Sequence, residues 1–247
     1  MKITAKHSYW QITTFPHLFP VNCYLVLERD GLTLIDTGIL AHAKGIISLI
    51  HKLKSPLKRI LLTHAHGDHI GGLIAVKAAF PEALVMIGSR EKLLVETKEI
   101  YAFEAQKPLK GSYSDRLPVR IDQILKDGDM VGSLLIIDTP GHTPGSISFF
   151  DERNGHLFVG DLFQTRGGAA ICGEKRWLFP FPAMGSWDLP TSIASAENLQ
   201  LFDVTEIACG HGPVKAIADF DLTNVLKRAK EQMKKTRKPG AGFLVFF

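Results

Sequence analysis

Cysteine is scarce in this sequence, and long apolar runs are missing. Its three cysteines, Cys23, Cys172 and Cys209, lie far apart and form no C-x-x-C motif. This excludes a disulfide framework and indicates a reducing cytoplasm. The opening residues MKITAKHSYW lack an apolar stretch after their charges, so we expect no signal peptide. No segment approaches the roughly 20 apolar residues that span a bilayer, so we expect no membrane association.

A strong excess of charge of either sign is also missing. The net charge is +4 and 22% of the residues are charged, which is ordinary for a globular enzyme and permits an anionic substrate. The segment 227–238, KRAKEQMKKTRK, is basic but has no interleaved aromatic residues. We interpret it as the solvated face of a helix and do not expect nucleic-acid binding.

Apolar runs alternate with stretches that have helical spacing. Residues 24–27 and 32–38 predict a hairpin that turns at Asp30-Gly31. Further strands are predicted at 59–63, 83–88, 133–139, 146–150, 156–161 and 206–210, and helices at 40–53, 69–79, 89–107, 190–202 and 217–237. Residues 108–130 are rich in turn formers. Strands that alternate with helices indicate a layered α/β fold, and no linker divides the chain.

Three histidines and an aspartate crowd the stretch LLTHAHGDHIGGL, residues 61–73. His64, His66 and Asp68 share one face of an extended segment, and His69 joins them only if the chain turns at Gly67. Asp68 would then be the N-cap of the following helix. Taken singly, Asp68 could be only a cap and His64 only a buried histidine. Taken together, the four side chains favour a metal site.

Three further candidates follow apolar strands elsewhere in the chain. His142 lies in a loop constrained by proline and glycine, Asp161 follows Gly160 directly, and His211 stands between two glycines. Because strand ends in α/β folds converge on one crevice, this recurring pattern suggests that the three join the first group. A mixed histidine and carboxylate set is typical of a catalytic metal site, since structural zinc sites favour cysteine.

The pattern H-x-H-x-D-H, followed by a histidine, an aspartate and a last histidine at strand ends, resembles the metallo-β-lactamase superfamily. The resemblance runs from LIDTG to CGHG. It implies one domain, residues 1–247, with an αββα sandwich of two mixed sheets flanked by helices. It also implies that His64, His66 and His142 hold one metal, that Asp68, His69 and His211 hold a second, and that Asp161 bridges both. Asp36 matches the aspartate that orients a metal-bound imidazole, although it could be only a turn residue.

This resemblance implies a hydrolase with two zinc ions, for which iron and manganese are alternatives. A hydroxide shared by the two ions would attack a carboxylic ester, thioester or lactone, and Asp68 would orient it or move its proton. Two other activities remain open. One is phosphodiester hydrolysis, and the other is an oxidoreductase with a single iron, similar to the persulfide dioxygenases.

The substrate is less well defined by the sequence. An aspartate at position 161, where zinc β-lactamases have cysteine, favours glyoxalase-II-like, lactonase and phosphodiesterase relatives. The chain ends soon after His211, so we expect the helical glutathione-binding domain of glyoxalase II to be missing or reduced. Residues 162–188 lack the tyrosine of quorum-quenching lactonases. The spacing from His142 to Asp161 leaves no room for the additions of RNA-processing relatives.

The pocket wall is expected in the aromatic stretch 163–187, with a small molecule as the partner. Trp177 and Phe179 are candidates for an apolar group of the substrate, Arg166 for an anionic group, and Phe19 for a cover over the site. The alternatives are packing for the aromatic side chains and a solvated loop for the basic ones. The apolar tail FLVFF, residues 243–247, is expected to be buried on the fold or against a second subunit in a homodimer.

Overall fold

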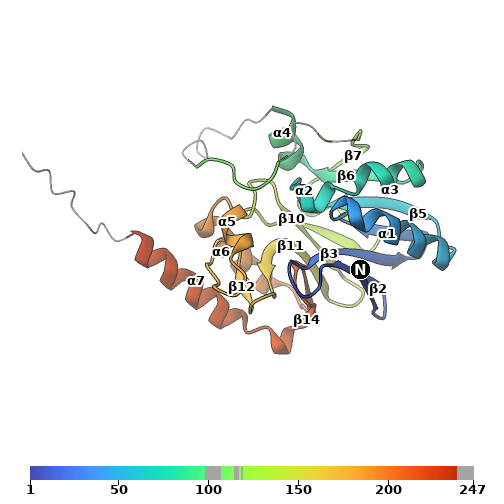
Figure 1. Cartoon of the computed structure of the whole chain (residues 1–247). Helices are drawn as coiled ribbons and strands as arrows, with labels where there is room; N and C mark the ends of the chain where they lie inside the picture. The colour runs from blue at the N-terminus through green and yellow to red at the C-terminus, as the bar shows by residue number, and fades with distance from the viewer. Residues whose placement is uncertain (98–106, 114–116, 118, 238–247) are drawn as a thin grey trace, which may run out of the picture.

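The computed structural model describes residues 1–97, 107–113, 117 and 119–237. Two β-sheets lie face to face, and helices cover the outer side of each (Figure 1). The first half of the chain builds one sheet in the order β1 to β7, from β1 Lys2–Ala5, β2 Tyr9–Thr14, β3 Val21–Glu28, β4 Gly31–Ile35, β5 Leu57–Leu62, β6 Leu84–Gly88 and β7 Gln123–Leu125. The pairs β4–β5, β5–β6 and β6–β7 are parallel, and the pairs from β1 to β4 are antiparallel.

The second half builds the other sheet, in the order β14-β13-β11-β10-β9-β8, with β12 paired to β11. Its strands are β8 Met130–Val131, β9 Leu134–Asp138, β10 Ile147–Asp151, β11 His156–Gln164, β12 Ala170–Ile171, β13 Glu206–His211 and β14 Lys215–Ala216. Only the pair β11–β13 is parallel among those described. Both sheets are therefore mixed, as predicted.

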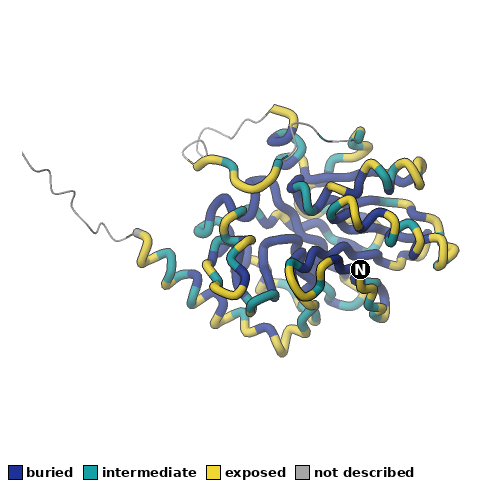
Figure 2. Tube along the Cα trace, viewed as in Figure 1, coloured by how far each residue is buried: buried dark blue, intermediate teal, exposed yellow. Residues whose placement is uncertain are grey.

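Three apolar clusters correspond to the three interfaces between the four layers. The inner cluster joins the sheets and includes Tyr9, Tyr24, Phe149 and Phe158, all almost fully buried. Burying one such side chain contributes about 1.5–3 kcal/mol. The outer clusters join each sheet to its helices, and Figure 2 shows the buried residues concentrated along the sheets. The predicted αββα sandwich is confirmed.

The helices divide between the two outer faces. Those of the first half are α1 Leu40–Leu53, α2 Gly67–Ile70, α3 Leu73–Ala79 and α4 Ser89–Thr97, and those of the second half are α5 Phe181–Gly185, α6 Leu189–Asn198 and α7 Leu222–Arg237, with 3-10 turns η1 Leu199–Leu201 and η2 Ile217–Asp219. Ile46 of α1 and Val76 of α3 pack on the first sheet, and Ile193 of α6 and Val225 of α7 pack on the second. Within the described residues, no helix is both long and apolar enough to cross a membrane.

Several predicted boundaries were wrong. The helix expected at 69–79 is divided into α2 and α3, because a Cβ on Gly72 would lie 2.5 Å from the carbonyl oxygen of Thr37. Asp68 is not the N-cap, since α2 begins at Gly67 and His66 caps it. The helices expected at 190–202 and 217–237 end or begin with 3-10 turns. Residues 98–106 and the tail 243–247 lie outside the described residues.

The hairpin predicted around Asp30-Gly31 is confirmed as β3 and β4. Two strands at the N-terminus, β1 and β2, were not predicted. No strand was predicted in the turn-rich residues 108–130, but they include β7 at the edge of the first sheet and the start of β8 in the second. These additions extend sheets whose central strands were predicted, so they do not change the architecture.

Candidate metal centre

The first-half candidates lie in the loop between β5 and α2, which holds His64 and His66, and in α2 itself, which holds Asp68 and His69. The strand ends at Leu62, the chain stays extended through His66, and α2 begins at Gly67. The Gly67 amide donates to the carbonyl oxygen of Ser112 at 3.0 Å, which fixes the turn. His64, His66 and His69 are buried. The turn expected from the sequence therefore does bring His69 to the same side as His64 and His66.

The second-half candidates come from three separate places in the second sheet, and the strand predicted to end at Asp161 continues to Gln164. His142 lies in the loop between β9 and β10, Asp161 lies within β11, and His211 ends β13. Glycines allow the close approach that this requires. Gly160 has φ +49°, and a Cβ there would lie 2.8 Å from Cβ of Thr63. A Cβ on Gly210 would lie 2.1 Å from Oδ1 of Asp161.

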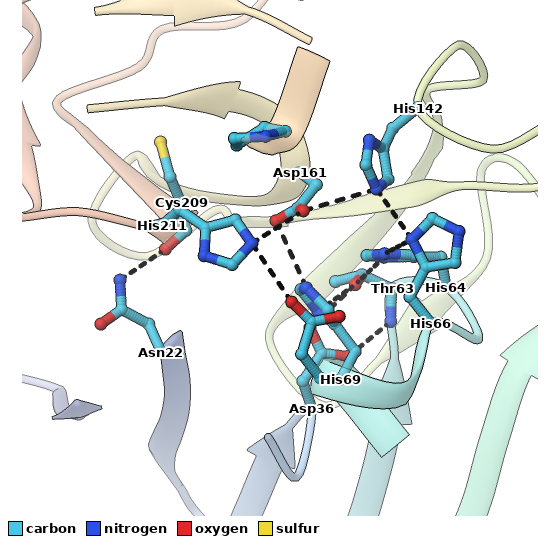
Figure 3. Close-up of polar contacts among 12 residues, drawn as sticks. Asn22, Asp36, Thr63, His64, His66, His69, His142, Asp161, Cys209 and His211 are labelled. Atoms are coloured by element: carbon cyan, nitrogen blue, oxygen red, sulfur yellow. Dashed lines mark hydrogen bonds and ion pairs between the residues drawn. The ribbon is translucent and has the colours of Figure 1, made fainter. Parts of the chain in front are cut away.

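The seven predicted ligands meet at the seam between the two sheets, and Figure 3 labels all of them except Asp68. In the first group, Nε2 of His64 lies 3.1 Å from Nδ1 of His66, and Nε2 of His142 lies 3.0 Å from the same Nδ1. Three imidazole nitrogens thus point at one another. Neutral rings in such a cluster direct lone pairs to a common point, which suits a cation.

Asp161 lies between this group and the second one. Its Oδ2 is 3.4 Å from Nε2 of His142 and 3.1 Å from Nε2 of His211, and its Oδ1 is 3.3 Å from Nε2 of His69. Asp68 completes the second group, with Oδ2 at 3.4 Å from Nε2 of His211. Asp68, His69 and His211 present ligand atoms within 4.8 Å of one another, as do His64, His69 and Asp161.

The hydrogen bonds on the outer side of these rings fit a metal site. Nε2 of His66 donates to the Lys110 carbonyl at 2.9 Å, and Nδ1 of His211 donates to the Pro20 carbonyl at 2.7 Å. Because a carbonyl can only accept, each neutral ring keeps its lone pair on the inner nitrogen. Nε2 of His69 and Oδ1 of Asp161 are buried, face each other at 3.3 Å and make no hydrogen bond that meets the usual geometry. Two such buried atoms suit direct coordination of a cation.

Asp36 lies beneath His69, in the place predicted for it. Its Oδ2 accepts from Nδ1 of His69 at 2.7 Å and from the Thr63 hydroxyl at 2.8 Å, and its Oδ1 accepts from the Thr63 amide at 2.9 Å. The backbone of Asp36 has φ +57°, a conformation that aspartate tolerates better than most residues. The residue therefore fixes both the ring of His69 and the loop that begins at Thr63.

The two groups of histidines differ in their electrostatics. Burial lowers the pKa of His142 to about 3 and also lowers the pKa of His64 and His66. Burial acts in the same direction on His211, but Asp161 and Asp68 outweigh it and raise the pKa of His211 to about 10. Asp161 and Asp36 likewise raise the pKa of His69. The histidines of the first group are therefore neutral at pH 7. His69 and His211 of the second group are protonated, so a cation that binds there has to displace their protons.

Asp68 is the most accessible carboxylate of the cluster, with 27% of its side chain exposed. Burial would raise its pKa, but the hydrogen bond from His211 and the positive charge of His69 keep that pKa below the ordinary value. Asp68 is therefore ionised at neutral pH and can accept a hydrogen bond from a water molecule.

The structure places the four predicted pocket residues in different surroundings. Phe179 is buried, and Phe19 packs on it and on the His211 ring at 5.2 and 5.0 Å between ring centroids. Arg166 donates to the carbonyl oxygen of His17 in the neighbouring loop. Trp177 is fully exposed and lines a cavity of about 570 Å³. Of these four residues, only Trp177 lines that cavity.

Two polar residues beside the centre were missed in the sequence. Glu91 of α4 is fully buried, and it accepts from the Ala65 amide at 2.9 Å and from the Thr143 hydroxyl at 2.7 Å. Asn22 of β3 donates to the carbonyls of Cys209 and Gly212 at 2.9 and 2.7 Å. Both residues connect the halves of the chain. Neither is near a recognisable motif, so only the tertiary structure reveals them.

Comparison with known proteins agrees with this geometry. The family model described as "Metallo-beta-lactamase superfamily" matches residues 17–211. An uncharacterized protein of Bacillus subtilis, YobT, is 44% identical over 94% of this chain and 100% of its own length. The hydroxyacylglutathione hydrolase GloC of Haemophilus influenzae is 31% identical over 86% of this chain and 95% of its own length.

Two solved structures also resemble the chain. The B3 metallo-beta-lactamase BLEG-1 is 26% identical, with a TM-score of 0.63 over 85% of this chain and 95% of its own. The protein TTHA1623, solved in a di-iron-bound form, is 25% identical, with a TM-score of 0.62 over 84% of this chain and 94% of its own. The fold, the meeting of the seven side chains and these matches lead to one conclusion. The chain belongs to the metallo-beta-lactamase superfamily and is a metal-dependent hydrolase.

Proposed function

We propose that the chain binds two divalent metal ions, zinc in the first instance, and hydrolyses a carboxylic ester, thioester or lactone. The observation that carries this proposal is the position of Asp161. Its carboxylate lies 3.4 Å from Nε2 of His142 in the first group. It also lies 3.3 and 3.1 Å from the Nε2 atoms of His69 and His211 in the second group. A carboxylate in that position can bind two cations at once, so the ligand set suits a pair of ions better than one.

His64, His66 and His142 would hold one ion, and Asp68, His69 and His211 the other, with Asp161 shared. Two such ions supply a water ligand whose pKa is lowered towards neutrality and a Lewis acid for the substrate oxygen. Asp36 contributes by holding the ring of His69. The Lys110 and Pro20 carbonyls do the same for His66 and His211.

Asp68 is the candidate for moving or orienting the proton of the attacking water. It is ionised, and it is more exposed than the other carboxylates of the centre. During hydrolysis, water adds across the acyl C–O or C–S bond, the acyl carbon gains the hydroxyl and the leaving oxygen or sulfur gains a proton. A partly exposed carboxylate beside the centre can accept a proton from the attacking water and pass it to the leaving oxygen or sulfur.

One similarity favours carboxylic esters and thioesters over phosphodiesters. The similar Haemophilus protein is named as a hydroxyacylglutathione hydrolase and is matched over nearly its whole length. We also propose a small-molecule substrate and a cytoplasmic location, for which the three buried, unpaired cysteines are the support.

Metal analysis combined with a substrate panel tests the proposal. Protein purified without added metal is expected to contain about two ions per chain, and to turn over p-nitrophenyl esters or S-acyl thioesters faster than bis-p-nitrophenyl phosphate. If the protein contained two iron ions and hydrolysed esters, only the identity of the metal in the proposal would change. The similar protein TTHA1623 was solved in a di-iron-bound form. A single iron with oxygen consumption on a persulfide would contradict the hydrolase assignment, and a preference for the phosphate diester would contradict the substrate class.

A further inference from the structure

An exposed apolar patch lies on the short segment that leads into and includes α5. Trp177, Leu178 and Met184 have exposed fractions of 100%, 83% and 70%. Single exposed apolar side chains are ordinary, but several large ones within one short segment indicate a binding surface. Trp177 is notable among them, because a tryptophan normally buries most of its large surface.

The patch forms part of the 570 Å³ cavity, a volume typical of small-molecule sites. Its apolar lining includes Trp177, Pro180 and Met184, and its charged lining is Lys110, Lys175 and Arg176. Among the residues that the structure describes, no carboxylate lines it. The cavity thus offers an apolar surface beside three cationic groups.

The cavity adjoins the candidate metal centre on both of its sides. On one side, the backbone carbonyl of Lys110 accepts from Nε2 of His66 at 2.9 Å. On the other side, α5 ends at Gly185, where a Cβ would lie 3.8 Å from Cε1 of His142 and 3.9 Å from Cα of Gly111. The Lys110 backbone and the end of α5 thus lie between the cavity and the two histidines of the first group.

The positive charge of the cavity is only partly neutralised. Nη1 of Arg176 lies 3.7 Å from Oε1 of Glu174, but the same oxygen also accepts from Nε of Arg228 at 2.9 Å. Among the described residues, neither Lys110 nor Lys175 has a carboxylate within 4.0 Å of its ammonium group. The cavity therefore attracts an anion, and its apolar surface selects one with an apolar part.

We propose that this cavity binds the recognition part of the substrate, and that the substrate is an amphipathic anion. It would carry an apolar chain or ring together with a carboxylate or phosphate, joined to the ester or thioester that is cleaved. The cleavage rests on the proposed function, but binding in the cavity does not. Hydrolysis would add water across the acyl bond and leave a carboxylic acid and an alcohol or thiol, one of which stays in the cavity.

A binding experiment tests the cavity without any turnover. Metal-loaded, full-length protein is titrated with decyl phosphate, decanol and inorganic phosphate, while calorimetry measures affinity and tryptophan emission reports on Trp177. Decyl phosphate is expected to bind at least about tenfold more tightly than either other probe, with a blue shift, since only it satisfies both parts of the cavity. Trp177→Ala and the double variant Lys175→Ala/Arg176→Ala should each weaken decyl phosphate about tenfold. Leu201→Ala is the matched control, because Leu201 is 85% exposed but lies outside the cavity.

A kinetic experiment then connects the cavity to catalysis. The ratio of kcat/KM for the mono-p-nitrophenyl ester of decanedioic acid to that for p-nitrophenyl acetate should fall about tenfold in Trp177→Ala. Tight binding of decyl phosphate without ester turnover would leave the cavity proposal standing and refute the proposed function. Ester turnover with equal affinity for all three probes would refute the cavity proposal. A dimer that dissociates in Trp177→Ala would also refute it, because the patch would then be a subunit interface.

Discussion

The two halves of the chain contribute to the candidate centre in opposite ways. The first half supplies His64, His66, Asp68 and His69 from one continuous segment, the loop after β5 and the helix α2. The second half supplies His142, Asp161 and His211 from three separate places, the loop after β9, the strand β11 and the end of β13. The segment is local, so one turn sets most of its geometry. The three places meet only when the second sheet is formed and packed against the first. The same centre thus combines a local motif with a tertiary one, and the two should respond differently to mutation.

Removing the shared carboxylate should have the largest effect. In the proposed assignment, Asp161→Ala would take a ligand from both groups, whereas His66→Ala would take one only from the first. We expect both variants to lose at least about a thousandfold in turnover, because the attacking water is no longer activated. Asp161→Ala should also retain fewer ions than His66→Ala by elemental analysis. Near-normal turnover in His66→Ala would refute the ligand assignment.

Filling the close approach at Gly210 should displace a candidate ligand at the seam between the two halves. A Cβ there would lie 2.1 Å from Oδ1 of Asp161 and 2.8 Å from Cε1 of His69, so Gly210→Ala must displace one of them. Turnover is expected to fall about a hundredfold, since small misplacements of reacting groups are costly. Gly185→Ala is the matched control, because its Cβ has ordinary contact at 3.8 Å from His142. Equal losses in the two variants would mean that the steric argument is wrong.

Glu91 provides a way to loosen the connection between the halves without touching a ligand. Its carboxylate holds the amide between His64 and His66 and the hydroxyl next to His142. Glu91→Ala should weaken metal binding about 10- to 100-fold, as loss of a residue that orients ligands usually does. Glu91→Gln should lose less, because its carbonyl oxygen can still accept from Ala65. Chelator competition and the visible spectrum of the cobalt-substituted protein measure this. An unchanged spectrum in Glu91→Ala would show that the residue serves packing alone.

The two groups of histidines should differ in the number of protons that they release when a metal ion binds. His211, with a pKa of about 10, and His69, with a raised pKa, are protonated at pH 7 in the metal-free protein. Their protons must leave when a cation binds, so affinity for the second ion should rise with pH and fall as pH drops, by about tenfold per pH unit for each proton displaced. The first group is already neutral at pH 7, so its ion should release none from the rings. Calorimetry in buffers of different ionisation heat counts the protons, and equal release at both steps would contradict this assignment.

The sequence predicted the parts of the centre that depend on local pattern. His64, His66, Asp68 and His69 stand together in the chain, and the alternation of strands and helices indicated a layered α/β fold. His142, Asp161 and His211 were suggested by their places after apolar strands. Their individual roles and the αββα sandwich came only from the resemblance to a family, because nothing local distinguishes a ligand from an ordinary loop residue.

The parts that the sequence did not reveal are those set by long-range contacts. Glu91 and Asn22 act through backbone groups far away in the chain, and no motif marks such partners. The division of the helix at Gly71 and Gly72 depends on the nearby backbone of Thr37 and Gly38. Phe179, expected in the pocket wall, is buried by Phe19 and the neighbouring loop, which only the packing of both loops decides.

The position of the centre on the seam between the sheets has a consequence for biosynthesis. As the chain leaves the ribosome, residues 1–125 can build the first sheet while His142, Asp161 and His211 are still unmade. Until the second sheet docks, the early loop offers an arriving ion an unfinished set of ligands. We therefore expect tight metal binding only after the second sheet has docked. The bound ion then stabilises the contact between the two halves.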